Sequence, residues 1–173
     1  MQLLARFRVA LGWVFGPLVL LLAEPTTASL LVGLAIAVAG ESLRFWAAGH
    51  LNKSREVTAS GPYRFFSHPL YVGSSIMGLG AGVASHSLIA IGLIALYLAV
   101  TLTAAIRSEE AHLRNLFGEH YDRFKRGELA RDTGLQRRFS FAQARANHEW
   151  RAVVGLVITW LLLFWKTTYN GMF

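Results

Sequence analysis

The sequence contains no cysteine, which excludes disulfide bonds, thiolate nucleophiles and metal sites with cysteine ligands. Charged residues are also scarce: they make up 16% of the 173 residues, whereas a soluble domain carries about 25%. Long tracts rich in Ser, Pro or Gln are missing, as are internal repeats. We therefore expect one membrane domain over residues 1–173, with no separate soluble domain.

Hydrophobic residues make up 54% of the chain and gather in five long segments. A helix needs about 20 apolar residues to cross the hydrocarbon core of a bilayer. The predicted transmembrane helices cover residues 7–23, 29–50, 69–85, 87–106 and 153–165, and the last can be extended back to Trp150. The expected fold is an all-α, polytopic integral-membrane helix bundle.

Lysine and arginine gather on one side of this predicted bundle. They lie before the first segment, between the second and third, and densely between the fourth and fifth, whereas the opposite side has only Lys166. The positive-inside rule then predicts a cytoplasmic N-terminus and a C-terminus outside the inner or plasma membrane. The same bias accounts for the net charge of +7, so we do not expect nucleic acid as a partner. Arg6 and Arg8 also fit the start of a signal peptide, an alternative that we rank below a retained helix.

Two short stretches on the predicted cytoplasmic side carry the polar chemistry. The first runs from Gly61 to Gly73 and reads GPYRFFSHPLYVG. Its Gly-Pro and His-Pro steps are turn and helix-start signals, and a helix that begins at Pro69 would offer free backbone N–H groups to a carboxylate. Tyr63 and Tyr71 supply flat faces for a base such as adenine. The alternative is an interfacial loop anchored by aromatic residues.

The second stretch begins with Glu109 and Glu110, just beyond the fourth apolar segment. Acidic residues are unfavourable at a helix C-terminus because of the helix dipole, so we expect the helix to continue into the cytoplasm. There a carboxylate can bind ribose hydroxyls and offset a positive charge on a bound molecule. The alternative is an ordinary solvated helix end.

Arg44 lies inside the second apolar segment, where an arginine needs a partner or a path to water. Glu41, one turn earlier, is the simplest partner. Pairing with Glu109 or Glu110 would instead place Arg44 beside a cofactor, and the sequence leaves both alternatives open. The histidine spacings are not those of a metal site, so no metal is predicted.

Together, the two stretches resemble the isoprenylcysteine carboxyl methyltransferase family. That family belongs to the integral-membrane S-adenosylmethionine (SAM) methyltransferases, which include phospholipid N-methyltransferases. The resemblance is strongest over residues 40–124. The shared pattern comprises Arg44, Gly61–Arg64, His68–Gly73, Glu109, Glu110, Leu113, Phe117, Gly118 and Tyr121.

The resemblance implies a SAM pocket at the cytoplasmic face, closed by the segment after the glutamate pair, and a lipid-side opening for a hydrophobic substrate. Catalytic roles are predicted for Arg107, Glu110 and Arg44. The implied cofactor-binding residues are Gly61, Tyr63, Arg64, His68, Pro69, Tyr71, Gly73, Glu109 and Glu110.

The chain departs from the family pattern at Ser67, where an arginine is usual. Arg64 or Arg107 would have to compensate for the missing charge. The connector over residues 125–151 is long and basic and receives no assignment. These departures leave the electrostatics of the site open.

The function expected from the resemblance is SAM-dependent methylation of a lipophilic acceptor, most simply a prenylated carboxylate. A carboxylate is already the nucleophile at neutral pH and needs only positioning and exclusion of water; Arg107 is the residue predicted to hold it. An amine acceptor must lose a proton first, which favours His68 or Glu110 as a base. The alternatives are a phospholipid or small-acceptor N- or S-methyltransferase, an NADPH-dependent membrane reductase and a non-catalytic membrane scaffold.

Overall fold

A computed structural model describes residues 12, 14–128 and 138–170, and this part of the chain contains helices and no strand. The all-α fold expected from the sequence is therefore confirmed. Residues 14–22 form a helix, and residues 7–11 and 13 of the first predicted segment lie outside the described residues. The remaining elements are α2 (Thr27–His50), the 3-10 helix η1 (Gly61–Arg64), α3 (Pro69–Ser85), α4 (Leu88–Phe117), α5 (Glu119–Lys125), α6 (Phe141–Ala146) and α7 (Trp150–Asn170).

Three of the described helices, α2, α4 and α7, are long and apolar enough to cross a membrane. Helix α3 covers the third predicted segment, residues 69–85, but has 17 residues and is the shortest of the four long helices. Helix α4 runs past residue 106 to Phe117, as expected for a helix that continues beyond the membrane. The membrane-helix architecture is thus confirmed, while the number of five spans stays a prediction.

Local sequence signals account for the helix ends. Thr26 caps α2 by accepting a hydrogen bond from the Ser29 backbone N–H, and the Ser29 hydroxyl accepts one in return from the Thr26 backbone N–H. Pro69 occupies the first turn of α3, where its missing N–H costs little. Helix α4 stops at Gly118, whose φ of +51° suits glycine and redirects the chain into α5.

Helices α2 and α3 pack closely through two pairs of glycines. A Cβ atom on Gly33 would lie 2.5 Å from the Gly80 carbonyl oxygen, and one on Gly40 would lie 2.7 Å from the Gly73 carbonyl oxygen. The reciprocal contacts are equally short, so both helices need glycine at these positions. This contact fixes the start of α3, and with it the Gly61–Gly73 stretch, against α2.

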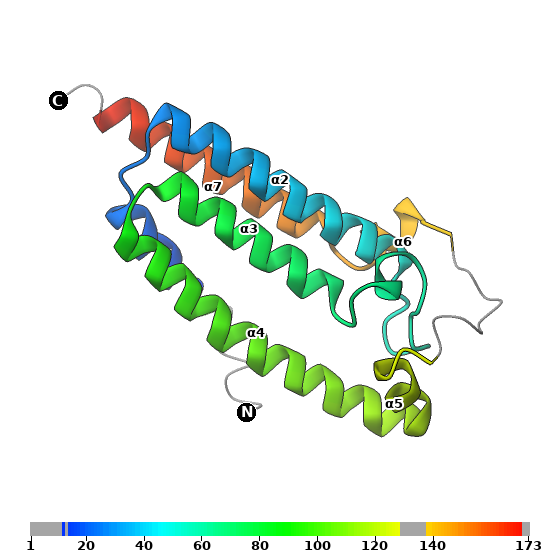
Figure 1. The fold of residues 1–173 in the computed structure, drawn as a ribbon. Coiled ribbons are helices and arrows are strands. Elements are labelled where there is room, and N and C mark those ends of the chain that lie inside the picture. The colour runs from blue at the N-terminus through cyan, green and yellow to red at the C-terminus, as the bar shows by residue number, and fades with distance from the viewer. Residues whose placement is uncertain (1–11, 13, 129–137, 171–173) are drawn as a thin grey trace.

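A tight turn connects α3 to α4, and the two helices diverge with distance from this turn (Figure 1). At the end of the bundle where α3 and α4 are furthest apart lie helix α5, helix α6 and the loop after α2 (Figure 1). Both polar stretches of the sequence lie at this end, one in η1 and the start of α3 and the other in the last part of α4. The fold therefore brings the two stretches to the same end of the bundle.

Candidate active site

A polar pocket of about 350 Å³ opens between the loop after α2, the start of α3, the end of α4 and α5. Its wall combines aromatic rings with charged and hydrogen-bonding groups. Among its lining residues are Lys53, Glu56, Tyr63, Tyr71, Glu109, His112, Tyr121 and Phe124. Ligand pockets commonly enclose roughly 300–1,000 Å³, so this cavity is large enough for a small cofactor.

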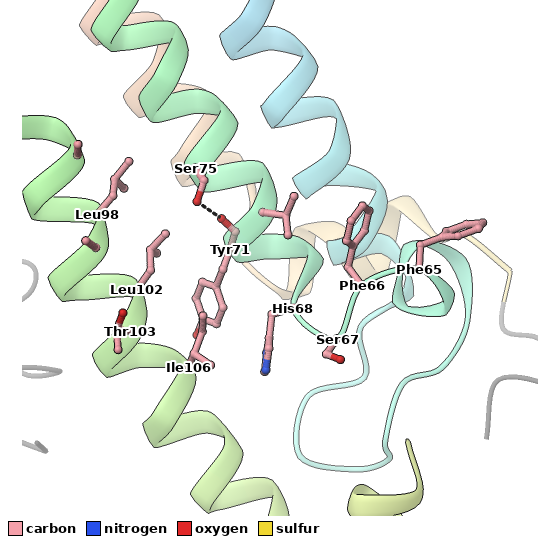
Figure 2. Close-up of a pocket in the computed structure, with 13 residues that line it drawn as sticks. Phe65, Phe66, Ser67, His68, Tyr71, Ser75, Leu98, Leu102, Thr103 and Ile106 are labelled. Atoms are coloured by element: carbon pink, nitrogen blue, oxygen red, sulfur yellow. Dashed lines mark hydrogen bonds between the residues drawn. The ribbon is translucent and has the colours of Figure 1, made fainter. Parts of the chain in front are cut away.

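A second hollow, the lipid-side groove, lies between α3 and α4 and encloses about 710 Å³. Its α4 wall is apolar apart from Thr103 and includes Leu98, Leu102 and Ile106. Figure 2 shows Tyr71 extending from α3 towards Leu102 and Ile106, with His68 beside it. Ser67 and Tyr71 line both this groove and the polar pocket, so the two hollows share a wall.

His68 joins the two polar stretches by contacting both glutamates of the pair. Its Nε2 atom lies 3.2 Å from Glu110 Oε1, and its Nδ1 atom lies 3.8 Å from Glu109 Oε2. Lys125 of α5 binds the same Glu110 oxygen from the other side. Burial on its own lowers the pKa of the His68 imidazole, but hydrogen bonds and charge interactions with the two carboxylates outweigh it, and the pKa is raised above its ordinary value.

Two tyrosines place hydroxyl groups at the glutamate end of the pocket. Tyr71 hydrogen-bonds to Glu109, and Tyr63 is buried nearby. Burial, together with the Glu109 carboxylate, raises the pKa of the Tyr63 phenol. The phenol therefore stays protonated at neutral pH and can donate a hydrogen bond to a ligand.

Helix α5 covers one side of the polar pocket with two buried rings. Tyr121 is 1% exposed, and with Phe124 it packs against the loop after α2 and the last turns of α4. Arg114 of α4 reaches across to Asp122, with 3.1 Å between Arg114 Nε and Asp122 Oδ1. The segment after the glutamate pair thus lies over this pocket.

Arg44 lies in a separate cluster between α2, α3 and α7. Its Nε atom is 3.6 Å from Glu41 Oε2 and 2.7 Å from Glu149 Oε1, and its Nη1 atom donates to Ser74 and to the Leu70 carbonyl. The structure therefore supports pairing with Glu41 and adds Glu149. The alternative pairing with Glu109 or Glu110 is not what the structure shows.

Other residues predicted for the site take different positions. Gly61 has a φ of +58° and passes over the His50 ring, where a Cβ would approach within 2.7 Å. Gly73 faces Gly40 in the contact between α2 and α3. Arg64 and Arg107 are exposed.

Sequence reasoning missed Lys125 and Glu149 because both lie in the unassigned connector over residues 125–151; Lys125 follows its partner Glu110 by 15 residues, and Glu149 lies about a hundred residues after Arg44. It also missed His112, whose Nε2 atom is 3.3 Å from the Ser54 hydroxyl; both residues line the polar pocket. The signal for His112 was present: it lies three residues after Glu109 and so shares its helix face.

Comparison with known proteins identifies the family of the chain. A family model described as phospholipid methyltransferase matches residues 26–120, more than half of the chain. The chain therefore belongs to the phospholipid methyltransferase family, and its apolar helices are those of an integral-membrane protein. The family expected from the sequence is confirmed.

Part of the chain is similar in sequence to three curated proteins. The cobalt-zinc-cadmium resistance protein CzcN of Cupriavidus metallidurans is 34% identical over 51% of this chain and 41% of its own length. The nickel-cobalt-cadmium resistance protein NccN of Alcaligenes xylosoxydans xylosoxydans is 34% identical over 56% of this chain and 45% of its own. Protein-S-isoprenylcysteine O-methyltransferase of Schizosaccharomyces pombe is 30% identical over 53% of this chain and 39% of its own.

The matched part thus spans less than half the length of each curated relative. No solved structure gives a significant match to the chain. Within the described residues, no group of three His, Asp or Glu side chains is arranged to hold a metal ion.

Proposed function

We propose that the protein transfers a methyl group from SAM to a lipophilic acceptor, as an isoprenylcysteine carboxyl O-methyltransferase-like enzyme. The observation that carries this proposal is the shared wall between the two hollows. A polar pocket and an apolar groove meet at Ser67 and Tyr71. A water-soluble donor on one side can thereby reach a membrane-resident acceptor on the other.

The residues of the polar pocket fit SAM. Glu56 and Glu109 place carboxylates in its wall, which suits a positively charged sulfonium and ribose hydroxyls. Tyr63 and Tyr121 supply aromatic faces for an adenine, and Lys53 supplies a cation for the amino-acid carboxylate. When bound, SAM supplies an electrophilic methyl group.

The chain's own contribution to such a transfer is positioning and exclusion of water. Helix α5 covers the polar pocket with Tyr121 and Phe124, while the lipid-side groove orients a hydrophobic tail along Leu98 and Leu102. Effective molarities from such orientation are large, and a dry site strengthens every electrostatic contact. A carboxylate acceptor then needs one cation, for which we propose Arg107, one residue beyond Ile106 at the end of the groove.

Methylation of a phospholipid amine is the second candidate, because the matching family model carries that description. The Glu109 and Glu110 carboxylates beside His68 also attract a cationic amine more than an anionic acceptor. An amine must lose a proton before it attacks, and the His68–Glu110 pair is the available proton acceptor. The acceptor's class therefore decides between Arg107 and His68 as the essential residue.

Isothermal titration of the purified full chain with SAM, S-adenosylhomocysteine and NADPH tests the donor. We expect both adenosyl compounds to bind and NADPH not to bind. Binding of NADPH alone would favour a reductase, and binding of none would favour a scaffold.

Transfer of labelled methyl groups to a prenylated cysteine analogue and to an aminolipid tests the acceptor. If the carboxylate is the acceptor, Arg107→Ala should reduce turnover far more than SAM binding, which marks lost acceptor positioning. Arg123→Ala on the exposed face of α5 is the matched control and should change neither. Full activity of the Arg107 variant would remove this residue from the proposal.

A further inference from the structure

A third hollow, the α2–α7 groove, lies apart from the candidate active site. It encloses about 510 Å³ and shares no lining residue with the polar pocket or the lipid-side groove. Its wall is apolar and aromatic apart from Ser42 and Glu41. Its lining includes Val38, Phe45, Trp46, Phe141, Val153 and Leu156.

The charged cluster beside this groove is incompletely hydrogen-bonded. Five buried side-chain atoms of the described residues lack a hydrogen-bond partner, and four of them belong to Glu41, Arg44 and Glu149. Both carboxylate oxygens of Glu41 are among them, and Glu41 is 7% exposed. Arg44 Nε and Glu149 Oε1 lie 2.7 Å apart but lack hydrogen-bond angles. The Glu41 carboxylate keeps its 3.6 Å ion pair with Arg44 but accepts no hydrogen bond. Burying a carboxylate without hydrogen bonds is costly, so the cluster favours a further polar partner.

The charges of the cluster indicate the sign of that partner. Two carboxylates, Glu41 and Glu149, face one guanidinium, so the cluster carries one excess negative charge when all three are ionised. Arg44 already donates to Ser74 and to the Leu70 carbonyl on its α3 side. Since a buried uncompensated charge is strongly unfavourable, a single cation at Glu41 would restore neutrality.

The order of groups along the groove indicates the shape of the partner. Val38 lies one turn from Glu41 towards the start of α2, and Phe45 lies one turn beyond it towards the end that carries the active site. Val153 and Leu156 continue the apolar wall along α7. A hydrocarbon chain can therefore run from the carboxylate into the apolar part, while the rings of Phe45 and Trp46 favour a cation beside Glu41.

We propose that the α2–α7 groove binds a membrane-resident amphiphile with a primary ammonium headgroup. The ammonium donates hydrogen bonds to the Glu41 carboxylate, and the hydrocarbon chain packs along Val38, Val153 and Leu156. This site is additional to the proposed methyl transfer and does not depend on it. The chain's net charge of +7 disfavours general attraction of cations, so retention of an ammonium requires a local carboxylate.

Photoaffinity labelling in phosphatidylcholine nanodiscs tests this site. The probes are dodecylammonium and dodecanol, each with a diazirine in mid-chain, and labelled peptides are mapped by mass spectrometry. We expect the ammonium probe to label residues 38–46 and 153–156 well above the alcohol probe, with competition by unlabelled dodecylammonium. Both probes should label the lipid-facing side of α4 around Leu96 equally, which serves as the internal reference.

The Glu41→Gln variant should lower the ammonium labelling of the groove by about tenfold or more, because a hydrogen bond to a charged group is lost. Ser42→Phe fills the groove without changing a charge and should have the same effect. Glu128→Gln removes an exposed carboxylate paired with Arg126 and should leave labelling unchanged. Equal labelling by the two probes, or undiminished labelling of folded Glu41→Gln, would overturn the proposal; a thermal unfolding curve reports whether that variant is folded.

Discussion

His68 shows how much one side chain of the site depends on its neighbours. Its imidazole contacts both glutamates of the second stretch, Glu109 and Glu110. Lys125 of α5 also binds Glu110. A protonated imidazole between two carboxylates is stabilised, whereas a neutral one leaves two negative charges side by side. The protonation state of His68 is therefore linked to the stability of the whole site.

We expect the stability of the protein to fall as pH rises from about 6.5 through the folded-state pKa of His68. The pKa of His68 is raised in the folded state, so its contribution is fully present below the ordinary value of about 6.5 and is lost as pH rises through the folded value. Thermal unfolding of the detergent-solubilised protein across this range measures the effect. His68→Gln should flatten this part of the pH profile, and an unchanged profile would contradict the assignment.

Replacing Glu110 with Gln should weaken S-adenosylhomocysteine binding by ~1–3 kcal/mol, the cost of lost hydrogen bonds to charged groups. Glu110 binds His68 and Lys125, so its loss loosens both the shared wall and the α5 cover. Titration calorimetry measures the affinity. Glu119→Gln, exposed at the start of α5, is the control and should bind normally; an unchanged affinity for Glu110→Gln would place the cofactor contact elsewhere.

The sequence predicted many of these residues because chemistry-bearing side chains lay in short, dense stretches. Tyr63, His68 and Tyr71 come from one stretch and the glutamates from another, and the fold brings them together. Glu149 was not predictable in the same way, because nothing in its surroundings points to Arg44 about a hundred positions earlier. Gly73 was assigned to the cofactor by its motif, whereas its place in the structure is a helix contact.

At the scale of elements, the contact between α2 and α3 leaves the least space for a larger side chain. Gly40→Ala should destabilise the protein by about 1–3 kcal/mol, since its Cβ would lie 2.7 Å from the Gly73 carbonyl oxygen and helix backbones cannot yield locally. Gly92→Ala on α4 meets nothing within 4 Å and should be neutral or stabilising. Unfolding midpoints of the two variants check this, and equal midpoints would show that the helices can move apart.

Long elements were predictable and short ones were not. Pro69 and the turn at His86 fix both ends of α3, and the sequence places it over the residues that the structure shows. Helices α5 and α6 have 7 and 6 residues and are too short to show a clear periodic pattern. Helix α6 lies in the connector without assignment, where Gln143 and Asn147 bind the Leu51 carbonyl at the end of α2. Such a cap depends on tertiary contact and leaves no local signal.

For the whole molecule, the positive-inside rule predicts a cytoplasmic N-terminus and a C-terminus on the opposite side. With five spans, a cytoplasmic reporter fused at the N-terminus and an external reporter at the C-terminus should both be active. This arrangement places the polar pocket at the cytoplasmic face, where SAM is available. Two cytoplasmic termini would remove one of the five predicted spans; α3, with 17 residues, is the shortest of the four long helices and is not among the three that are long and apolar enough to cross.

The relation between the two hollows leads to a prediction about how substrates reach the site. SAM should come from the cytosol through the polar pocket, and the acceptor should come sideways from the bilayer through the lipid-side groove between α3 and α4. Ala99→Trp places a large ring in that groove and should lower transfer to a prenylated acceptor by about tenfold or more, at unchanged SAM affinity. Methyl-transfer assays and calorimetry on the same preparation separate the two effects.

Leu96→Trp on the same helix is the matched control for that experiment. Leu96 is 58% exposed and does not line the groove, so its replacement should leave both transfer and SAM affinity intact. An inactive Leu96 variant would mean that α4 tolerates no tryptophan and that the loss at Ala99 reports folding. Normal transfer by Ala99→Trp, or equal rates with water-soluble and prenylated acceptors, would mean that acceptors approach from water. The groove would then be a gap filled by lipid, and the shared wall at Tyr71 would no longer carry the proposed function.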